Sequence, residues 1–243
     1  MRQAASELHP PGPLALALEW RAPAEAGASL LMWPWLRRAA PGDGHNVLVL
    51  PGLAAGDGST LLLRRHLRRQ GWRAHAWRQG LNLGPREGVF EGLQDRLRQL
   101  HEQSGRRVSL VGWSLGGVFA RELAKRHPAL VRQVVTLGSP MPGMGHASNA
   151  RRLYEFVAGR RAYAPELMAR LQDPVPDSVP CTSLYSHSDG IVHWRASLLP
   201  PGARRQNIRV PASHSGMGVN PVVLRLLADR LAQPEDDWQP YRG

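Results

Sequence analysis

The chain has 243 residues, 42% hydrophobic and 21% charged, with a formal net charge of +12 at pH 7. This length suits one large domain with a sizeable core, and no apolar run is long enough to cross a bilayer. A single cysteine, Cys181, excludes an internal disulfide and a cysteine-based zinc site. We expect a soluble, cytoplasmic protein without a secretion signal.

The basic residues are scattered along the chain, and all except Lys125 are arginines. They form short clusters at the ends or on the polar faces of predicted elements, at residues 64–69, 106–107, 151–152 and 204–205. We interpret them as solvated helix faces and predict no nucleic-acid partner. The alternative is a surface that binds nucleic acid or an anionic membrane.

Residues 1–44 are rich in proline and glycine and are predicted to form an N-terminal extension. Their one apolar segment, residues 30–36, contains two tryptophans and is followed by Arg37 and Arg38. This pattern fits a packed N-terminal helix. It also fits a peripheral membrane anchor with an aromatic face and a basic flank, so both interpretations remain open.

From residue 45 onward, short β-prone runs alternate with amphipathic helical patterns, which predicts an α/β domain over residues 45–243 with a mostly parallel sheet. Six strands are predicted, at residues 47–50, 72–77, 108–111, 134–137, 182–185 and 207–210. Helices are predicted on both faces, at residues 60–70, 89–103, 115–127 and 221–233. Right-handed crossovers would place the carboxyl ends of the strands on one edge, where such sheets gather their chemistry.

A candidate nucleophile lies between the third strand and the helix that follows it. Residues 112–116 read G-x-S-x-G with Ser114 at the centre. A sharp turn there would hold the serine at the sheet edge, with glycines letting the backbones cross and a helix N-terminus favouring developing negative charge. We predict that Ser114 is a nucleophile; the alternative is a glycine-rich turn with an incidental serine.

A serine hydroxyl needs a base, and the base needs a carboxylate that orients it. His214 lies in a short loop between the last strand and the last helix, and Asp189 follows the strand at 182–185. The order serine, acid, histidine is the one found with this kind of nucleophile turn. We therefore predict His214 as base and Asp189 as its partner, because His187 and His193 lie on the wrong loop.

The oxyanion of acyl transfer needs two backbone donors. One is predicted to be the N–H of Leu115, and the other the N–H of Leu53 in the loop after the first strand, where Gly52 lets the chain double back. The alternative is that Pro51 and Gly52 form only a turn. A triad and an oxyanion hole supply the proton and charge handling, so no metal or cofactor is predicted.

Residues 138–180 are longer than a simple connection between two strands requires, and they predict a small cap-like insertion. Its methionines and aromatic residues indicate an adaptable apolar wall for a substrate. We predict substrate contacts from Met141 and Met144, and from Trp113 beside the nucleophile. The competing interpretation is that the apolar groups pack only on one another and leave a shallow site.

Residues 112–117, 134–138, 182–186 and 189–192, followed by His214, resemble in order the small bacterial lipases and their uncharacterised α/β-hydrolase relatives. The resemblance runs from about residue 47 to residue 233. It implies an α/β-hydrolase fold and an esterase or lipase whose triad is Ser114, Asp189 and His214, with Leu53 and Leu115 as oxyanion donors.

Two positions depart from those lipases without removing a catalytic atom. Trp113 stands where they often have histidine, and Pro51 stands where a histidine commonly precedes the oxyanion glycine. Residues 77–84 also resemble a motif of the uncharacterised relatives and are expected to shape a loop near the site.

The leading hypothesis is hydrolysis of a small-molecule carboxylic ester, with lipid esters among the candidates, through an acyl-Ser114 intermediate. A thioesterase or amidase would use the same residues. A hydrolase-fold protein that binds without catalysis is the rival from another class. The sequence predicts neither the acyl length nor the oligomeric state.

Overall fold

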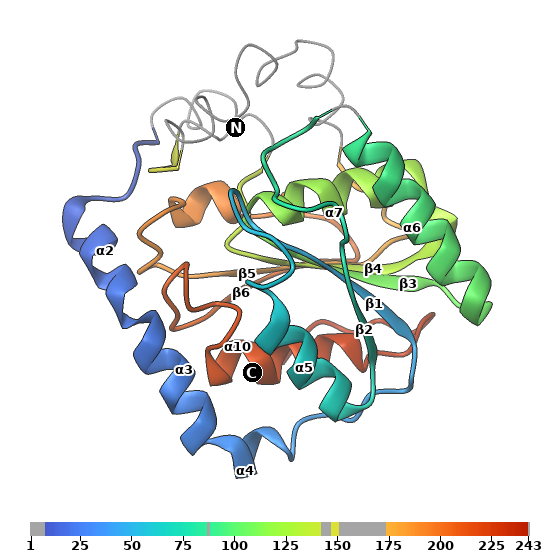
Figure 1. The fold of residues 1–243 in the computed structure, drawn as a ribbon, viewed down its shortest axis with the longest axis horizontal. Helices are drawn as coiled ribbons and strands as arrows, with labels where there is room; N and C mark the ends of the chain where they lie inside the picture. Colours follow the sequence, from blue (N-terminus) through green and yellow to red (C-terminus); the bar gives the residue numbers. More distant parts are fainter. Residues whose placement is uncertain (1–7, 87, 142–146, 151–173, 243) are drawn as a thin grey trace.

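A computed structural model of the protein describes residues 8–86, 88–141, 147–150 and 174–242. Within these residues six strands form one sheet in the order β2-β1-β3-β4-β5-β6, and every pair of neighbours is parallel (Figure 1). The strands are β1 (Asn46–Leu50), β2 (Arg73–Ala76), β3 (Val108–Trp113), β4 (Val131–Leu137), β5 (Cys181–Tyr185) and β6 (Arg205–Arg209).

Helices cover both faces of the sheet (Figure 1). On one face lie α6 (Val89–Ser104) and α7 (Leu115–Arg126), and on the other lie α5 (Leu61–Gln70) and α10 (Pro221–Leu231). The alternation of side chains along β1 explains this arrangement: Val47 and Val49 belong to the core beneath α5 and α10, whereas Leu48 and Leu50 belong to the core beneath α6 and α7.

The described N-terminal residues, from residue 8 onward, add three short helices and a 3₁₀ turn at the edge of this body (Figure 1). They are α2 (Pro13–Ala17), η1 (Leu18–Arg21), α3 (Ala22–Leu31) and α4 (Trp33–Leu36). The described residues also include the 3₁₀ turns η2 (Pro128–Leu130) and η5 (Trp194–Ser197).

The structure confirms the predicted fold class, with its six strands, the helices on both faces and the parallel order. The largest correction is at β4, which begins at Val131 and not at residue 134. Because Arg132 and Gln133 are polar, the sequence shows no apolar strand pattern at these positions. Both are nevertheless buried. Arg132 is stabilised there by an ion pair with Asp43, at 2.8 Å.

The predicted cap at 138–180 lies largely outside the described residues. One described contact at its base is an antiparallel bridge between Ser148 and Val192. The boundaries of the extension, the hydrolase domain and the cap therefore stay predictions.

One part of the apolar segment at residues 30–36 packs on the core, and another part is exposed to solvent. Trp33 and Trp35 pack against the core and Leu36 is buried in it, as a packed helix requires. Leu30 and Leu31 are 79% and 85% exposed, so membrane contact through these leucines stays a prediction. No helix in the described ranges is both long and apolar enough to span a membrane.

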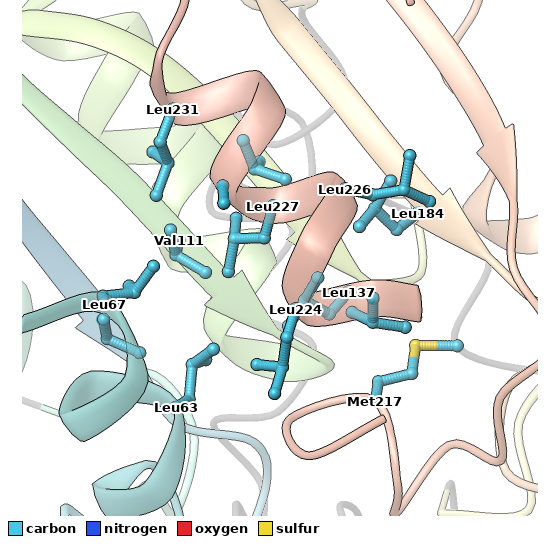
Figure 2. Packing of buried hydrophobic residues seen from close by; sticks show 14 of the residues in the cluster. Leu63, Leu67, Val111, Leu137, Leu184, Met217, Leu224, Leu226, Leu227 and Leu231 are labelled. Atoms are coloured by element: carbon cyan, nitrogen blue, oxygen red, sulfur yellow. The ribbon is translucent and has the colours of Figure 1, made fainter. Parts of the chain in front are cut away.

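Helix α10 closes the core on its face of the sheet (Figure 2). Its leucines point toward β3, β4 and β5 and toward α5, and Leu227 is fully buried among them. This helix also follows the loop that carries His214, so its packing anchors one end of that loop. Its first turn is capped by Asn220, whose side chain accepts from the N–H of Val222 at 3.0 Å.

We predict that Leu227→Ala lowers the free energy of unfolding by about 2–5 kcal/mol, because it opens a cavity that the rigid sheet cannot fill. Denaturant unfolding measures this loss. The matched control is Leu30→Ala, which removes an exposed leucine and should change stability by less than about 0.5 kcal/mol. Equal effects of the two changes would contradict the packing described for α10.

Candidate active site

Ser114 occupies a strained turn between β3 and α7. Its backbone has φ 52° and ψ −121°, in a region that L-residues rarely adopt. The Ser114 N–H donates to the Leu137 carbonyl at 2.8 Å, which fastens the turn to the end of β4. The serine is only half-buried, so its hydroxyl is accessible at the carboxyl edge of the sheet.

The glycines of the G-x-S-x-G motif are required by close packing. A Cβ on Gly112 would lie 2.3 Å from the Cα of Gly117, and a Cβ on Gly116 would lie 2.3 Å from the Leu50 carbonyl oxygen. Helix α7 therefore crosses β3 and β1 at a separation that admits only glycine. This close crossing is what forces the sharp turn at Ser114.

Asp189 and His214 form a bonded acid–base pair. The Nδ1 of His214 lies 2.8 Å from Asp189 Oδ2, and the two residues are 7% and 3% exposed. The other carboxylate oxygen, Oδ1, accepts the N–H groups of Ile191 and Val192 at 2.9 and 2.7 Å. With the carboxylate fixed in this way, His214 donates through Nδ1 and keeps Nε2 free to accept a proton.

Contacts along β4 bring this pair next to the serine turn. A Cβ on Gly138, the residue after Leu137, would lie 2.9 Å from Asp189 Oδ2 and 3.0 Å from His214 Nδ1. Gly138 has φ 52°, so the chain bends away there and leaves room for both side chains. The Ser114 N–H is bonded to the carbonyl of Leu137, the residue before Gly138. Ser114 therefore lies beside the Asp189–His214 pair.

Trp113 joins the serine turn to the loop between β6 and α10, which carries His214 (the histidine loop, or base loop). Its Nε1 donates to the His214 carbonyl at 3.0 Å, and its ring lies against Gly218. No hydrogen bond joins Ser114 Oγ to His214 among the described residues. Such catalytic contacts often tighten only when a substrate is bound.

The surroundings of His214 favour its protonated form. Burial lowers the pKa of the ring, but the charge of Asp189, its hydrogen bond and the charge of Glu19 raise it, and the net pKa lies above the usual value. A base whose cationic form is stabilised in place can receive a serine proton and later return it.

The neighbouring histidines are engaged elsewhere. His193 Nδ1 accepts the N–H of Arg195 at 3.3 Å, and burial and the Arg195 charge lower its pKa. The His187 ring packs on Trp194, with centroids 4.4 Å apart. Neither ring is bonded to Asp189 in the described part of the chain, so the geometry favours His214 as the base.

The loop after β1 lies against the serine turn. A Cβ on Gly52 would be 3.3 Å from Ser114 Cβ. The Leu53 N–H has no acceptor among the described residues, and the Leu115 N–H is at the first position of α7, where no intrahelical acceptor exists. Both predicted oxyanion donors are therefore unpaired next to Ser114.

Asn82 holds the loop after β1 in place, a role that the sequence did not reveal. Its side chain is fully buried, and its Nδ2 donates to the Pro51 carbonyl at 2.8 Å. Its backbone carbonyl accepts the Ala54 N–H at 2.7 Å, and its N–H donates to the Ala55 carbonyl at 2.8 Å. The signal was the motif at residues 77–84, which was expected to shape a loop.

The three predicted substrate residues are placed differently. Trp113 packs against the core beneath α5 and α10 and also contacts the loop that carries His214. Met141 packs on the core beneath α6 and α7, and its N–H donates to the Ala196 carbonyl at 2.6 Å. Met144 lies outside the described residues. Substrate contact by any of the three stays a prediction.

We predict that Asp189→Asn lowers the pKa of His214, because it removes the carboxylate charge and leaves the effect of burial. The neutral ring should then persist to lower pH. An NMR titration of the His214 ring measures this shift. Asp95→Asn, which changes an exposed carboxylate on α6, should leave the titration unchanged. An equal or higher pKa in Asp189→Asn would contradict the described pair.

A family model described as palmitoyl protein thioesterase matches residues 71–184, which is less than half of the chain. No curated protein sequence matches the chain. Many solved structures match its fold.

One is Aspergillus fumigatus lipase B, with 18% identity, a TM-score of 0.56 and 82% of this chain covered. The chain spans only 57% of that lipase's length. Another is mature Bacillus licheniformis lipase BlEst2, with 15% identity, a TM-score of 0.56, and 80% of this chain and 94% of that chain covered.

A third is an esterase from Exiguobacterium antarcticum, with 14% identity, a TM-score of 0.52, and 78% of this chain and 92% of that chain covered. At these identities the likeness establishes the fold. Together with the parallel sheet and the turn at its edge, it confirms that this chain has the α/β-hydrolase fold.

Proposed function

We propose that this protein is a serine hydrolase that cleaves carboxylic esters through an acyl-Ser114 intermediate. The observation that carries the proposal is the strained turn at Ser114, held beside a bonded and buried Asp189–His214 pair. Strain of this kind persists only where the surroundings impose it, and it is concentrated at functional sites. Serine, acid and base each follow a different strand at one edge of the sheet.

In the first half of the reaction, Ser114 Oγ attacks the ester carbonyl carbon while His214 Nε2 takes the hydroxyl proton. The carbonyl oxygen becomes an oxyanion and is stabilised by the N–H groups of Leu53 and Leu115. The intermediate collapses when the bond to the alcohol oxygen breaks. His214 gives its proton to the departing alcohol, and the acyl group stays on Ser114.

In the second half, water attacks the acyl carbon and His214 accepts a proton from it. The bond to Ser114 Oγ then breaks, His214 returns the proton to the serine, and the carboxylic acid leaves. Asp189 keeps its charge throughout, since its role is to hold the ring and stabilise the imidazolium.

A thioesterase is the second candidate, favoured by the match to the palmitoyl protein thioesterase model over residues 71–184. The same residues would act on a thioester, with a thiol leaving in place of an alcohol. Catalytic efficiencies on an oxygen ester and a thioester of one acyl chain separate the two candidates. An amidase would use the same groups, with an amine leaving.

We predict that Ser114→Ala lowers ester hydrolysis by about 10⁴–10⁶-fold and abolishes labelling by a fluorophosphonate probe. The matched control is Ser109→Ala, on the strand that leads to Ser114, whose hydroxyl is fully buried and bonded to His45. That variant should label and turn over normally. Near-normal hydrolysis by Ser114→Ala would overturn the proposed function, and a wild-type protein that neither labels nor hydrolyses esters would indicate a binding protein.

We predict that Asn82→Ala lowers kcat by about 10²–10³-fold with little change in KM, because the loop that presents the Leu53 N–H loses its anchor. The control is Asn46→Ala, which removes an equally buried asparagine bonded to the Leu100 carbonyl at the opposite end of β1. It should lower stability without lowering kcat. Equal kcat in both variants would contradict a role of Asn82 in holding the loop that presents the Leu53 N–H.

A further inference from the structure

Two carboxylates of the N-terminal extension bind the loops that carry the acid and the base. Glu19 lies in η1 and Glu25 in α3, far from both loops in the sequence. The loops after β5 and β6 have backbone N–H groups that no strand or helix pairs. Four of these donors point at the N-terminal carboxylates, three at Glu19 and one at Glu25.

Glu19 bridges the two loops directly. Its Oε1 accepts the N–H of Gly190, next to the acid, at 2.8 Å and the N–H of His214, the base, at 2.9 Å. Its Oε2 accepts the N–H of Ser215 at 2.7 Å. Hydrogen bonds to a carboxylate are stronger than those between neutral groups, so one side chain ties the acid loop to the base loop.

Glu25 and Arg21 add further hydrogen bonds to the same two loops. Glu25 Oε1 accepts the Ser213 N–H at 2.8 Å and the Arg21 Nε–H at 2.9 Å. Arg21 Nη2 donates to the Ser188 hydroxyl at 2.7 Å, in the acid loop. A Cβ on Gly216 would lie 2.2 Å from Glu25 Oε2, so the base loop closes tightly over this carboxylate.

The backbone of the N-terminal helices touches the acid loop as well. A Cβ on Gly190 would lie 2.3 Å from the Ala15 carbonyl oxygen, so only glycine admits α2 at this distance. The acid loop is therefore enclosed between the sheet and the extension. The Asp189–His214 bond spans two loops from different strands, so its length depends on the register in which those loops are held.

We propose that the N-terminal extension is part of the active site and that Glu19 is a positioning residue, which holds the His214 loop in register with the Asp189 loop. The proposal rests on the proposed serine-hydrolase function. It gives the extension a role in turnover that neither its composition nor its exposed leucines indicated.

The charge of Glu19 adds a second effect. Two charged groups act on the His214 ring: Asp189 from the acid loop and Glu19 from η1. Glu25 and Arg21 form an ion pair with each other next to the loop that carries His214. Both Asp189 and Glu19 raise the pKa of His214. Removing the Glu19 charge should therefore lower that pKa and move the rising limb of the pH profile to lower pH.

The test compares Glu19→Gln, Glu19→Asp and the control Glu102→Gln in the full chain, with p-nitrophenyl butyrate as substrate. Glu102 is exposed near the end of α6, which joins β3 at its amino end, away from the site. Glu19→Gln keeps the shape but loses the charge and one acceptor, and Glu19→Asp keeps the charge but is one methylene shorter.

We expect Glu19→Gln to lower kcat by about 10–100-fold with KM changed less than about threefold, since small misplacement of a catalytic group is costly. Its pH profile should move to lower pH. Glu19→Asp should keep the wild-type profile with a reduced kcat, and Glu102→Gln should match the wild type. A purely structural role would lower only the unfolding temperature, with kcat well below that temperature unchanged.

Wild-type kcat and pH profile in both Glu19 variants would overturn the proposal. Should Glu19→Gln fail to fold, the kcat of Glu19→Asp decides. If the wild-type protein neither hydrolyses esters nor reacts with a fluorophosphonate, the proposed function fails. The positioning role is then judged by NMR, and His214 backbone and ring signals in folded Glu19→Gln that match those of the wild type would refute it.

Discussion

The hydrogen bond between Asp189 and His214 is the interaction on which the rest of the site depends, because its two partners follow different strands. The sheet sets the strand ends, Gly138 leaves room for both side chains, and Trp113 fastens the histidine loop to the serine turn. The N-terminal carboxylates bind the same two loops from outside. The pair is thus held between the sheet edge and the extension.

Much of the fold could be predicted because it follows from short-range patterns. The alternation in β1, the leucine spacing of α6 and the glycines around Ser114 each depend on neighbours within a few residues. The parallel order then placed the candidate serine, acid and histidine on one edge. The features that escaped prediction depend on distant partners. The start of β4 depends on Asp43, the loop after β1 on Asn82, and the loop that carries His214 on Glu19, 195 residues away.

A second serine–histidine–aspartate set shows why residue types alone do not define the site. Ser109 Oγ lies 2.8 Å from His45 Nε2, and His45 Nδ1 is bonded to Asp43. Ser109 and His45 are fully buried at the amino end of the sheet, and burial, with the charge of Arg132, lowers the pKa of His45 to about 4. An inaccessible hydroxyl in an unstrained strand has no substrate to attack, so strain and access distinguish Ser114.

The proposed function requires a covalent acyl-serine intermediate, which mass spectrometry can detect directly. The wild-type protein is mixed with excess p-nitrophenyl butyrate, quenched in acid within the first turnovers and digested. We predict a butyryl group on the peptide that contains Ser114, formed together with an initial release of p-nitrophenol. Hydrolysis that proceeds with the acyl group on another residue would contradict it.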